Sequence, residues 1–182
     1  VFAVIAHTRE QARRVAARAK DVLSIDSLPP VLTPQDAHTK GQYVIPPMHL
    51  ARTTNAGGAQ AAIARAPRRL KDTLEVGGQE QFYLEGQISY AIPKEGGIHV
   101  YCSTQHPSEM QHLVAHALGL HSHDVQVECR RMGGGFGGKE SQSAIFACVA
   151  AVAAQRLKRP VKLRLDRDDD FLITGRRHCF WY

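Results

Sequence analysis

The residues best suited to chemistry lie in one glycine-rich stretch, RRMGGGFGGKE, at positions 130–140. Glycine costs about 0.5–1 kcal/mol relative to alanine inside regular structure, so the cluster indicates a backbone that turns sharply or approaches something closely. Phe136 can offer an aromatic face to a flat molecule, and Glu140 can exchange hydrogen bonds with its heteroatoms. The stretch therefore predicts a site for a planar, hydrogen-bonding heterocycle beside an electronegative centre. The alternative is a tight packing point between a helix and a strand.

Two nucleotide-binding motifs match this stretch only in part. Gly133, Gly135 and Gly138 satisfy G-x-G-x-x-G, but the acidic residue expected about 20 positions later in a dinucleotide fold is absent at 157–159. A P-loop needs a Ser or Thr hydroxyl directly after the lysine, where this chain has Glu140. A carboxylate there would repel phosphate, so neither motif is adopted.

The neighbouring sequence predicts that the glycines form a strand-to-helix loop. Val125, Val127 and Cys129 alternate with polar residues, which is typical of a half-buried strand, and an apolar helix is expected over Ser141–Leu157. The N-terminus of that helix would present free N–H groups, which favour anionic ligands.

Turn residues and periodicity predict the other elements. Pro107 suits the start of a helix and Gly119 its end, and the Lys94–Gly97 turn joins two strands into a hairpin. Residues 33–66 are expected to hold short helices and extended chain. The predicted strands are Val1–His7, Asp21–Ile25, Lys71–Val76, Gly86–Ile92, Ile98–Cys102 and Val161–Leu165, and a further helix is predicted over Arg9–Lys20.

Composition is that of an ordinary globular protein. Of 182 residues, 43% are hydrophobic and 22% charged, which excludes disordered and fibrous classes. The net charge of +6 could suit nucleic acid or an anionic small molecule. A nucleic-acid-binding module is the weaker hypothesis, because the basic residues are not interleaved with aromatic ones.

The chain has no apolar run that approaches the ~18 residues of a membrane span. The longest, Ala144–Ala154, is too short, and no signal-like segment precedes it, so we expect a cytoplasmic protein. The chain opens inside an apolar run and closes on aromatic residues, which leads us to expect a fragment.

Metal ligation by the chain itself is not predicted. The cysteines contain no C-x-x-C, and we interpret them as reduced core residues. His112 and His116 are four apart on a predicted helix but lack the glutamate of H-E-x-x-H, which disfavours zinc. The four cysteines are Cys102, Cys129, Cys148 and Cys179.

Two charged features are interpreted without a catalytic role. The run Asp166–Asp170 is expected to be a solvated turn that caps a helix. Lys139 is expected to neutralise either Glu140 or a charge on a cofactor.

Four motifs together resemble the molybdenum-binding subunit of xanthine dehydrogenases, in the xanthine oxidase/aldehyde oxidase family of molybdenum hydroxylases. They occur in the family's order and cover essentially the whole chain. The motifs are VGGQEQFYLEGQ at 76–87, STQHP at 103–107, RRMGGGFGGKE at 130–140 and RPVKLRLDRDDDFLITGRRH at 159–178.

This resemblance implies an α+β fold and three parts. Residues 1–33 would be the end of a hammerhead-like α/β domain, and 34–66 a connecting segment. Residues 67–182 would be the first part of a molybdopterin-binding domain.

The implied activity is hydroxylation of hypoxanthine and xanthine, with water as the oxygen source. The implied cofactor here is molybdenum-molybdopterin, held by its own dithiolene without protein ligands. Electrons would pass to [2Fe-2S] clusters and FAD on other parts or subunits of a hetero-oligomeric enzyme. The fragment would be inactive alone.

The resemblance also implies roles for four residues. Gln79 matches the glutamine whose amide bonds a terminal ligand of the molybdenum. Phe136 matches the loop residue that lies against the cofactor, with its N–H and that of Gly137 near the metal's oxygen ligands. Glu140 matches the glutamate that binds the purine. The catalytic base is expected outside these 182 residues.

One departure from the family pattern puts none of the implied roles in doubt, and one alternative substrate class stays open. Gln81 stands where relatives commonly have histidine. Aldehyde oxidases of similar sequence tend to carry an apolar residue where this chain has Glu140, which favours a purine. The alternative is a related hydroxylase that acts on aldehydes or other N-heterocycles.

Overall fold

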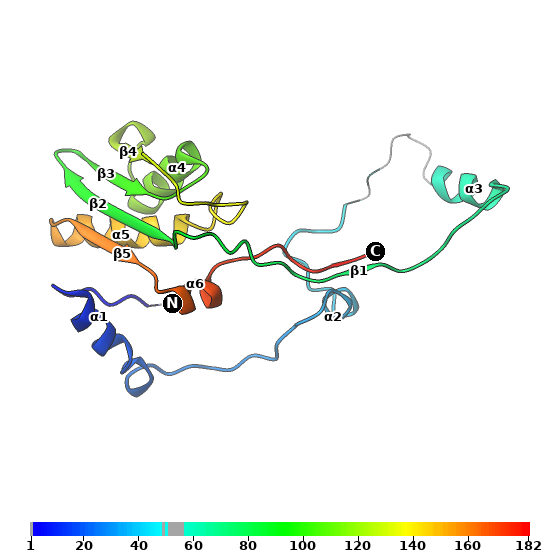
Figure 1. Ribbon diagram of the computed structural model, residues 1–182, viewed down its shortest axis with the longest axis horizontal. Helices are drawn as coiled ribbons and strands as arrows, with labels where there is room; N and C mark the ends of the chain where they lie inside the picture. The colour runs from blue at the N-terminus through cyan, green and yellow to red at the C-terminus, as the bar shows by residue number, and fades with distance from the viewer. Residues whose placement is uncertain (1, 49, 51–56) are drawn as a thin grey trace. The chain divides into compact units, whose positions relative to one another are not determined.

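The structure, a computed structural model, describes residues 2–48, 50 and 57–182. The chain folds into two compact units (Figure 1). The first comprises Val1–Ile25 and Gln79–Arg177, and the second comprises Asp26–Gly78 and His178–Tyr182. The domain boundaries predicted after residues 33 and 66 stay a prediction, because a compact unit need not coincide with a domain.

A four-stranded sheet organises the first unit, with the strand order β4-β3-β2-β5. β2 pairs with β3 and with β5 in antiparallel fashion, whereas β3 and β4 are parallel. The predicted hairpin is confirmed as β2 and β3, and Gly96 in its turn has a φ of 74°. The strands are β2 (Ile88–Lys94), β3 (Gly97–Cys102), β4 (Val125–Glu128) and β5 (Val161–Arg164).

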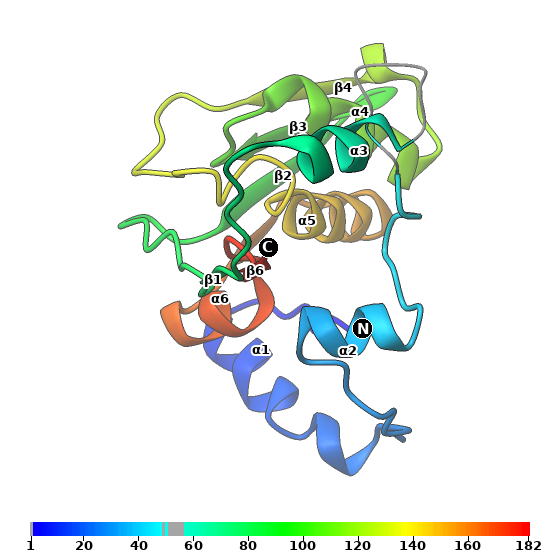
Figure 2. The ribbon, with the colours of Figure 1, turned by 90° about the vertical axis from the view of Figure 1, so that its right-hand side faces the viewer.

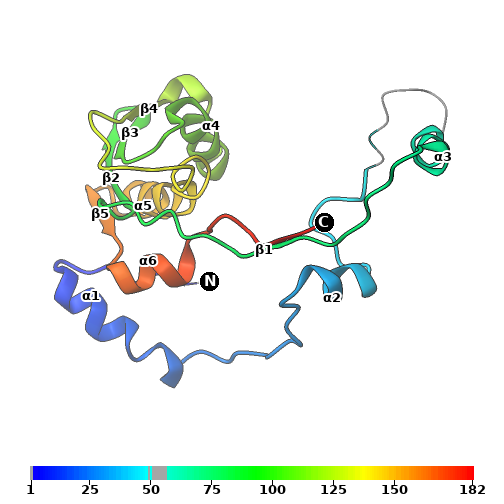
Figure 3. The ribbon, with the colours of Figure 1, turned by 45° about the vertical axis from the view of Figure 1, so that its right-hand side comes forward.

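Two helices, α4 (Pro107–Leu118) and α5 (Ala144–Leu157), pack on one face of this sheet (Figure 3). Fully buried side chains from both layers form the core, including Val100 of β3, Met110 of α4 and Ala150 of α5. α5 is rich in alanine, whose small side chain lets a helix backbone lie close to its neighbours. Its buried residues are Ala144, Phe146, Ala147, Ala150, Ala151, Ala153 and Ala154.

Both ends of α4 confirm the sequence prediction. Pro107 occupies the first turn, where its missing N–H costs nothing. Gly119 ends the helix in the left-handed conformation, with a φ of 65°. Parallel strands need such a crossover connection, and α4 followed by η2 (Ser122–Asp124) supplies it between β3 and β4.

The amino-terminal prediction is wrong in its strands. Residues 2–7 and 21–25 form none, because no neighbouring strand within the described residues offers them hydrogen bonds. The predicted helix ends at Ala16 as α1 (Arg9–Ala16), followed by the short η1 (Ala19–Asp21). No residue of α1 is buried, so no packed face extends it.

The second unit has little regular structure. Its described residues form the helices α2 (Pro34–Thr39) and α3 (Gly58–Arg65), which fits the short helices predicted there. The sequence predicts a strand over Lys71–Val76, but the observed strand, β1, contains only Glu75–Val76. Its partner β6 (Phe180–Trp181) offers hydrogen bonds over only two residues.

The mixture of helix and sheet confirms the predicted α+β class. In the described part of the chain no helix is long and apolar enough to cross a membrane. The cysteines are free: Cys102 lies in the core, where burial raises the pKa of its thiol to about 12, whereas Cys179 is exposed. The core interpretation is therefore wrong for Cys179.

Candidate functional site

The glycine stretch joins β4 to α5, as predicted (Figure 2). The helix begins at Ala144, three residues later than expected. The intervening loop packs against two other segments of the first unit, residues 81–87 and 103–105. We call residues 131–140 the glycine loop.

One face of the glycine loop is closed against protein side chains. Each of three glycines approaches one so nearly that a Cβ would collide with it, which is the packing role considered as the alternative. A Cβ at Gly133 would lie 2.6 Å from Glu85 Cβ, one at Gly135 would lie 2.5 Å from Gln105 Oε1, and one at Gly138 would lie 2.6 Å from Tyr83 Cε1.

The other face is open. The Phe136 side chain is 76% exposed and is held at a φ of 53°, a left-handed conformation that is strained for an aromatic residue. A Cβ on Gly137 would meet no described atom within 4 Å. Glu140 is also exposed and has no hydrogen bond or ion pair within the described residues. These three residues form the surface that a ligand could reach.

Gln105 connects the two faces of the glycine loop. Its Oε1 accepts hydrogen bonds from the N–H groups of Gly137 at 3.0 Å and Lys139 at 3.2 Å. Its Nε2 makes no hydrogen bond to any described residue, so a neutral donor is left beside the loop. The STQHP motif contains this glutamine, but the sequence alone assigned it no role; its position just before α4 was the available signal.

The structure does not bring Gln79 to the glycine loop. Its backbone pairs with that of Arg177 at 2.9 and 3.0 Å, and its exposed side chain donates to the carbonyl of Glu80 at 3.3 Å. The side-chain amides that bond the loop belong to Gln87, Gln105 and Gln142 instead.

Lys139 does not pair with Glu140. Its side chain is completely buried, and Nζ donates to Glu85 Oε2 at 3.1 Å, to the Glu85 carbonyl at 2.6 Å and to Ser103 Oγ at 2.8 Å. Desolvation would raise the pKa of Glu85, but hydrogen bonds from Ser103, Gly133 and Lys139 outweigh it and lower that pKa. The expected neutralisation of Glu140 is therefore wrong.

The expectation of a solvated turn over Asp166–Asp170 is wrong for Asp170. It lies in α6 (Arg167–Ile173), is only 2% exposed, and accepts hydrogen bonds from the Tyr83 hydroxyl at 2.7 Å and the Gln87 N–H at 3.1 Å. Burial and the bond to Asp170 raise the pKa of Tyr83. Gln87 also donates to the Gly138 carbonyl at 3.0 Å, which extends this buried network to the glycine loop.

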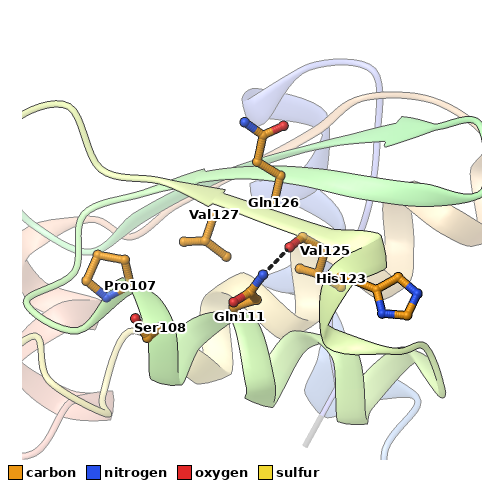
Figure 4. A pocket seen from close by; sticks show the side chains of 7 residues that line it. All are labelled: Pro107, Ser108, Gln111, His123, Val125, Gln126 and Val127. Atoms are coloured by element: carbon orange, nitrogen blue, oxygen red, sulfur yellow. Dashed lines mark hydrogen bonds between the residues drawn. The ribbon is translucent and has the colours of Figure 1, made fainter.

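A separate pocket lies along the edge strand β4, between it and α4 (Figure 4). Gln111 lies in it and donates to the Val125 carbonyl at 2.7 Å. It contains none of the predicted site residues. The histidines nearby form no metal site: His112 contacts the Ser122 hydroxyl at 2.9 Å, and no group of three or more potential ligands occurs among the described residues.

The open face has the donors that a molybdenum-pterin group needs from the protein. The N–H of Phe136 and Nε2 of Gln105 are neutral donors without described partners, suited to electronegative ligands of a metal. The exposed Phe136 ring can cover one side of the group. The residues fit the group.

Comparison with known proteins agrees. The family described as the molybdopterin cofactor-binding domain matches residues 42–182. The chain is 43% identical to a xanthine dehydrogenase of Drosophila pseudoobscura pseudoobscura, over 100% of the chain and 13% of that protein. It is 39% identical to the xanthine dehydrogenase/oxidase of Gallus gallus, over 99% of the chain and 13% of that protein.

Solved structures give the same family relationship. The Cu,Mo-CO dehydrogenase in its carbon monoxide-reduced state is similar over 90% of this chain and 23% of that chain, with a TM-score of 0.68 and 25% identity. The chain spans only 13% of the length of the relatives named above. Because the family match covers most of the chain, the protein belongs to the molybdopterin cofactor-binding domain family.

Proposed function

We propose that this chain is part of the molybdenum-cofactor subunit of a xanthine dehydrogenase. The whole enzyme would hydroxylate hypoxanthine and xanthine, with water as the oxygen source. The observation that carries this proposal is Glu140, an exposed carboxylate without a described partner at the end of the glycine loop. The identity to xanthine dehydrogenases over the full chain supports it.

Four residues would hold and orient the reacting groups. The Phe136 ring would cover the cofactor, and its N–H with Nε2 of Gln105 would donate to electronegative ligands of the metal. We propose Gln105 for the amide role first predicted for Gln79, because Gln105 bonds the glycine loop and its Nε2 has no described partner, whereas the described bond of the Gln79 side chain is to Glu80. The N–H of Gly137 already donates to Gln105, so its contribution is to fix that amide.

Glu140 would recognise the purine. A carboxylate can accept hydrogen bonds from purine N–H groups or, when protonated, donate to a ring nitrogen or carbonyl oxygen. Molybdenum bound to the pterin supplies the two-electron oxidation. The closed face of the glycine loop would hold Glu140 at a constant distance from Phe136.

Further parts complete the proposed enzyme. The catalytic base, [2Fe-2S] clusters and FAD would lie outside these 182 residues, on other domains or subunits of a hetero-oligomer. The chain alone would then bind molybdopterin weakly and oxidise no purine. We retain the cytoplasm as the expected compartment.

The test is metal analysis and turnover of the full-length protein that contains this segment. We expect molybdenum in the purified protein and faster turnover of xanthine than of an aldehyde. Absence of molybdenum would overturn the proposal. A clear preference for aldehydes would instead favour the related hydroxylase considered above.

A further inference from the structure

Lys139 is the largest side chain of the described residues that is fully buried, although it adjoins the exposed Glu140 in sequence. An ammonium group taken out of water costs several kcal/mol unless its charge and its donors are satisfied. Here all three protons have acceptors: the carbonyl and carboxylate of Glu85 and the hydroxyl of Ser103. The Tyr83 ring lies 4.7 Å from Nζ, which adds a cation–π contact.

The backbone of Lys139 is anchored as firmly as its side chain. Its N–H donates to Gln105 Oε1 at 3.2 Å, and its carbonyl accepts from the Gln105 N–H at 2.8 Å and the Thr104 hydroxyl at 3.1 Å. The residue is therefore held on both sides of its Cα. These partners come from segments 34 to 54 residues away in the chain.

Glu85 is held in turn by the glycine loop. Its Oε2 accepts from Lys139, from the Ser103 hydroxyl and from the Gly133 N–H at 3.1 Å. The first glycine of the loop and its lysine are thus bonded to one carboxylate. Loss of either charge would remove the ion pair that links the two ends of the loop.

We infer that the Lys139–Glu85 ion pair is a positioning device that sets substrate selectivity by fixing the backbone from which Glu140 projects. This inference rests on the proposed substrate role of Glu140. Lys139 is not placed to touch the substrate, because its side chain is buried. The side chain of Glu85 is 39% exposed, but its Oε2 is engaged by Lys139, Ser103 and Gly133. Adjacent Cα atoms are about 3.8 Å apart, so a displaced Lys139 must displace Glu140.

The ion pair also affects the carboxylate of Glu140. An ammonium beside Glu140 would compete with the substrate for that carboxylate. Because Glu85 satisfies Lys139, Glu140 keeps its hydrogen-bonding capacity for a ligand. Glu85 therefore acts on selectivity through Lys139.

The test compares variants of the full-length enzyme. Lys139→Met removes the charge, and Glu85→Gln keeps an acceptor while weakening the pair. The matched control is Lys162→Met, which removes an exposed lysine on β5. Two quantities are measured on each protein: hydrogen exchange of the amides at 133–140, and the ratio of kcat/KM for xanthine to that for an aldehyde, per molybdenum bound.

We expect Lys139→Met to raise amide exchange in the glycine loop at least tenfold, and to lower the xanthine-to-aldehyde ratio at least fivefold. Glu85→Gln should move both quantities in the same direction by less, and Lys162→Met should move neither. If Lys139→Met does not accumulate as folded protein, the milder Glu85→Gln decides the question. Wild-type exchange and an unchanged ratio in Glu85→Gln or Lys139→Met would overturn the inference.

A further variant, Glu140→Gln, separates this inference from the proposed function. If Glu140→Gln leaves the ratio unchanged, the substrate role of Glu140 fails whatever the exchange data show. If Glu140→Gln lowers the ratio but Lys139→Met does not, the positioning role alone fails. A uniform loss of activity with both substrates in Lys139→Met, at an unchanged ratio, would indicate a purely structural ion pair.

Discussion

The two faces of the glycine loop differ in what they contact, although residues of both faces lie within the same ten positions of the chain. Gly133, Gly135 and Gly138 pack against protein side chains, whereas Phe136 and Gly137 face open space. Glycine is needed on the closed face because no Cβ fits, and on the open face because Gly137 has a φ of 87°. One cluster of glycines thus forms a close-packed face and an exposed face, for different physical reasons.

The largest expected effect tests whether Gln105 or Gln79 supplies the side-chain amide that would donate to ligands of the metal. In the full-length enzyme, Gln105→Ala should lower kcat roughly a hundredfold, the size expected when one preorganised donor is lost. Gln79→Ala should change kcat less than about threefold, because its exposed side chain bonds only Glu80. Steady-state kinetics of both variants decide the matter, and a larger loss in Gln79→Ala would return the amide role to that residue.

The next effect tests the closed face. Gly138→Ala would place a Cβ 2.6 Å from the Tyr83 ring and 3.0 Å from the Gly135 carbonyl oxygen. Overpacking of this kind costs about 1–3 kcal/mol, which urea denaturation of the 182-residue chain can measure. Gly77→Ala is the control, since a Cβ there meets nothing described within 4 Å. Equal stability of the two variants would contradict the close-packed face.

The third expected effect concerns Glu140 on the open face of the glycine loop. Glu140→Val should lower kcat/KM for purines at least about tenfold, or 1.4 kcal/mol, because a polar substrate edge loses its partner. Aldehyde oxidation should stay level or improve. Since Glu140 is exposed and has no partner among the described residues, thermal stability should be unchanged. A parallel loss with both substrates, or a lower melting temperature, would point to a structural role.

The smallest expected effect is on the stability of the fold at acidic pH. The folded state lowers the pKa of Glu85, so this carboxylate contributes stability above its ordinary value of about 4.5, and the contribution disappears as pH falls through the lowered pKa. Glu85→Gln should therefore be less stable than wild type at pH 7, and the difference should shrink below pH 4.5. Urea denaturation at several pH values measures it, with Glu95→Gln in the exposed hairpin turn as control. A difference that stays constant with pH would refute the linkage.

Local sequence determined the elements whose signals lie within a few residues. The Pro107 and Gly119 signals defined α4, and the turn near Gly96 defined the β2–β3 hairpin. The strand-to-helix position of the glycine loop also followed from alternation before it and apolar residues after it. Such features depend on backbone conformational preferences, which adjacent residues set directly.

Tertiary structure decided which of these residues face one another. Lys139 pairs with Glu85 across 54 residues, and Asp170 receives a hydrogen bond from Tyr83 across 87, so no local pattern marks either contact. Lys139 and Glu140 adjoin in sequence, yet one is buried and the other exposed, because burial depends on where the chain folds back. For the same reason the predicted strands at 2–7 and 21–25 did not form: a strand needs a partner, and only the assembled fold determines whether one is present.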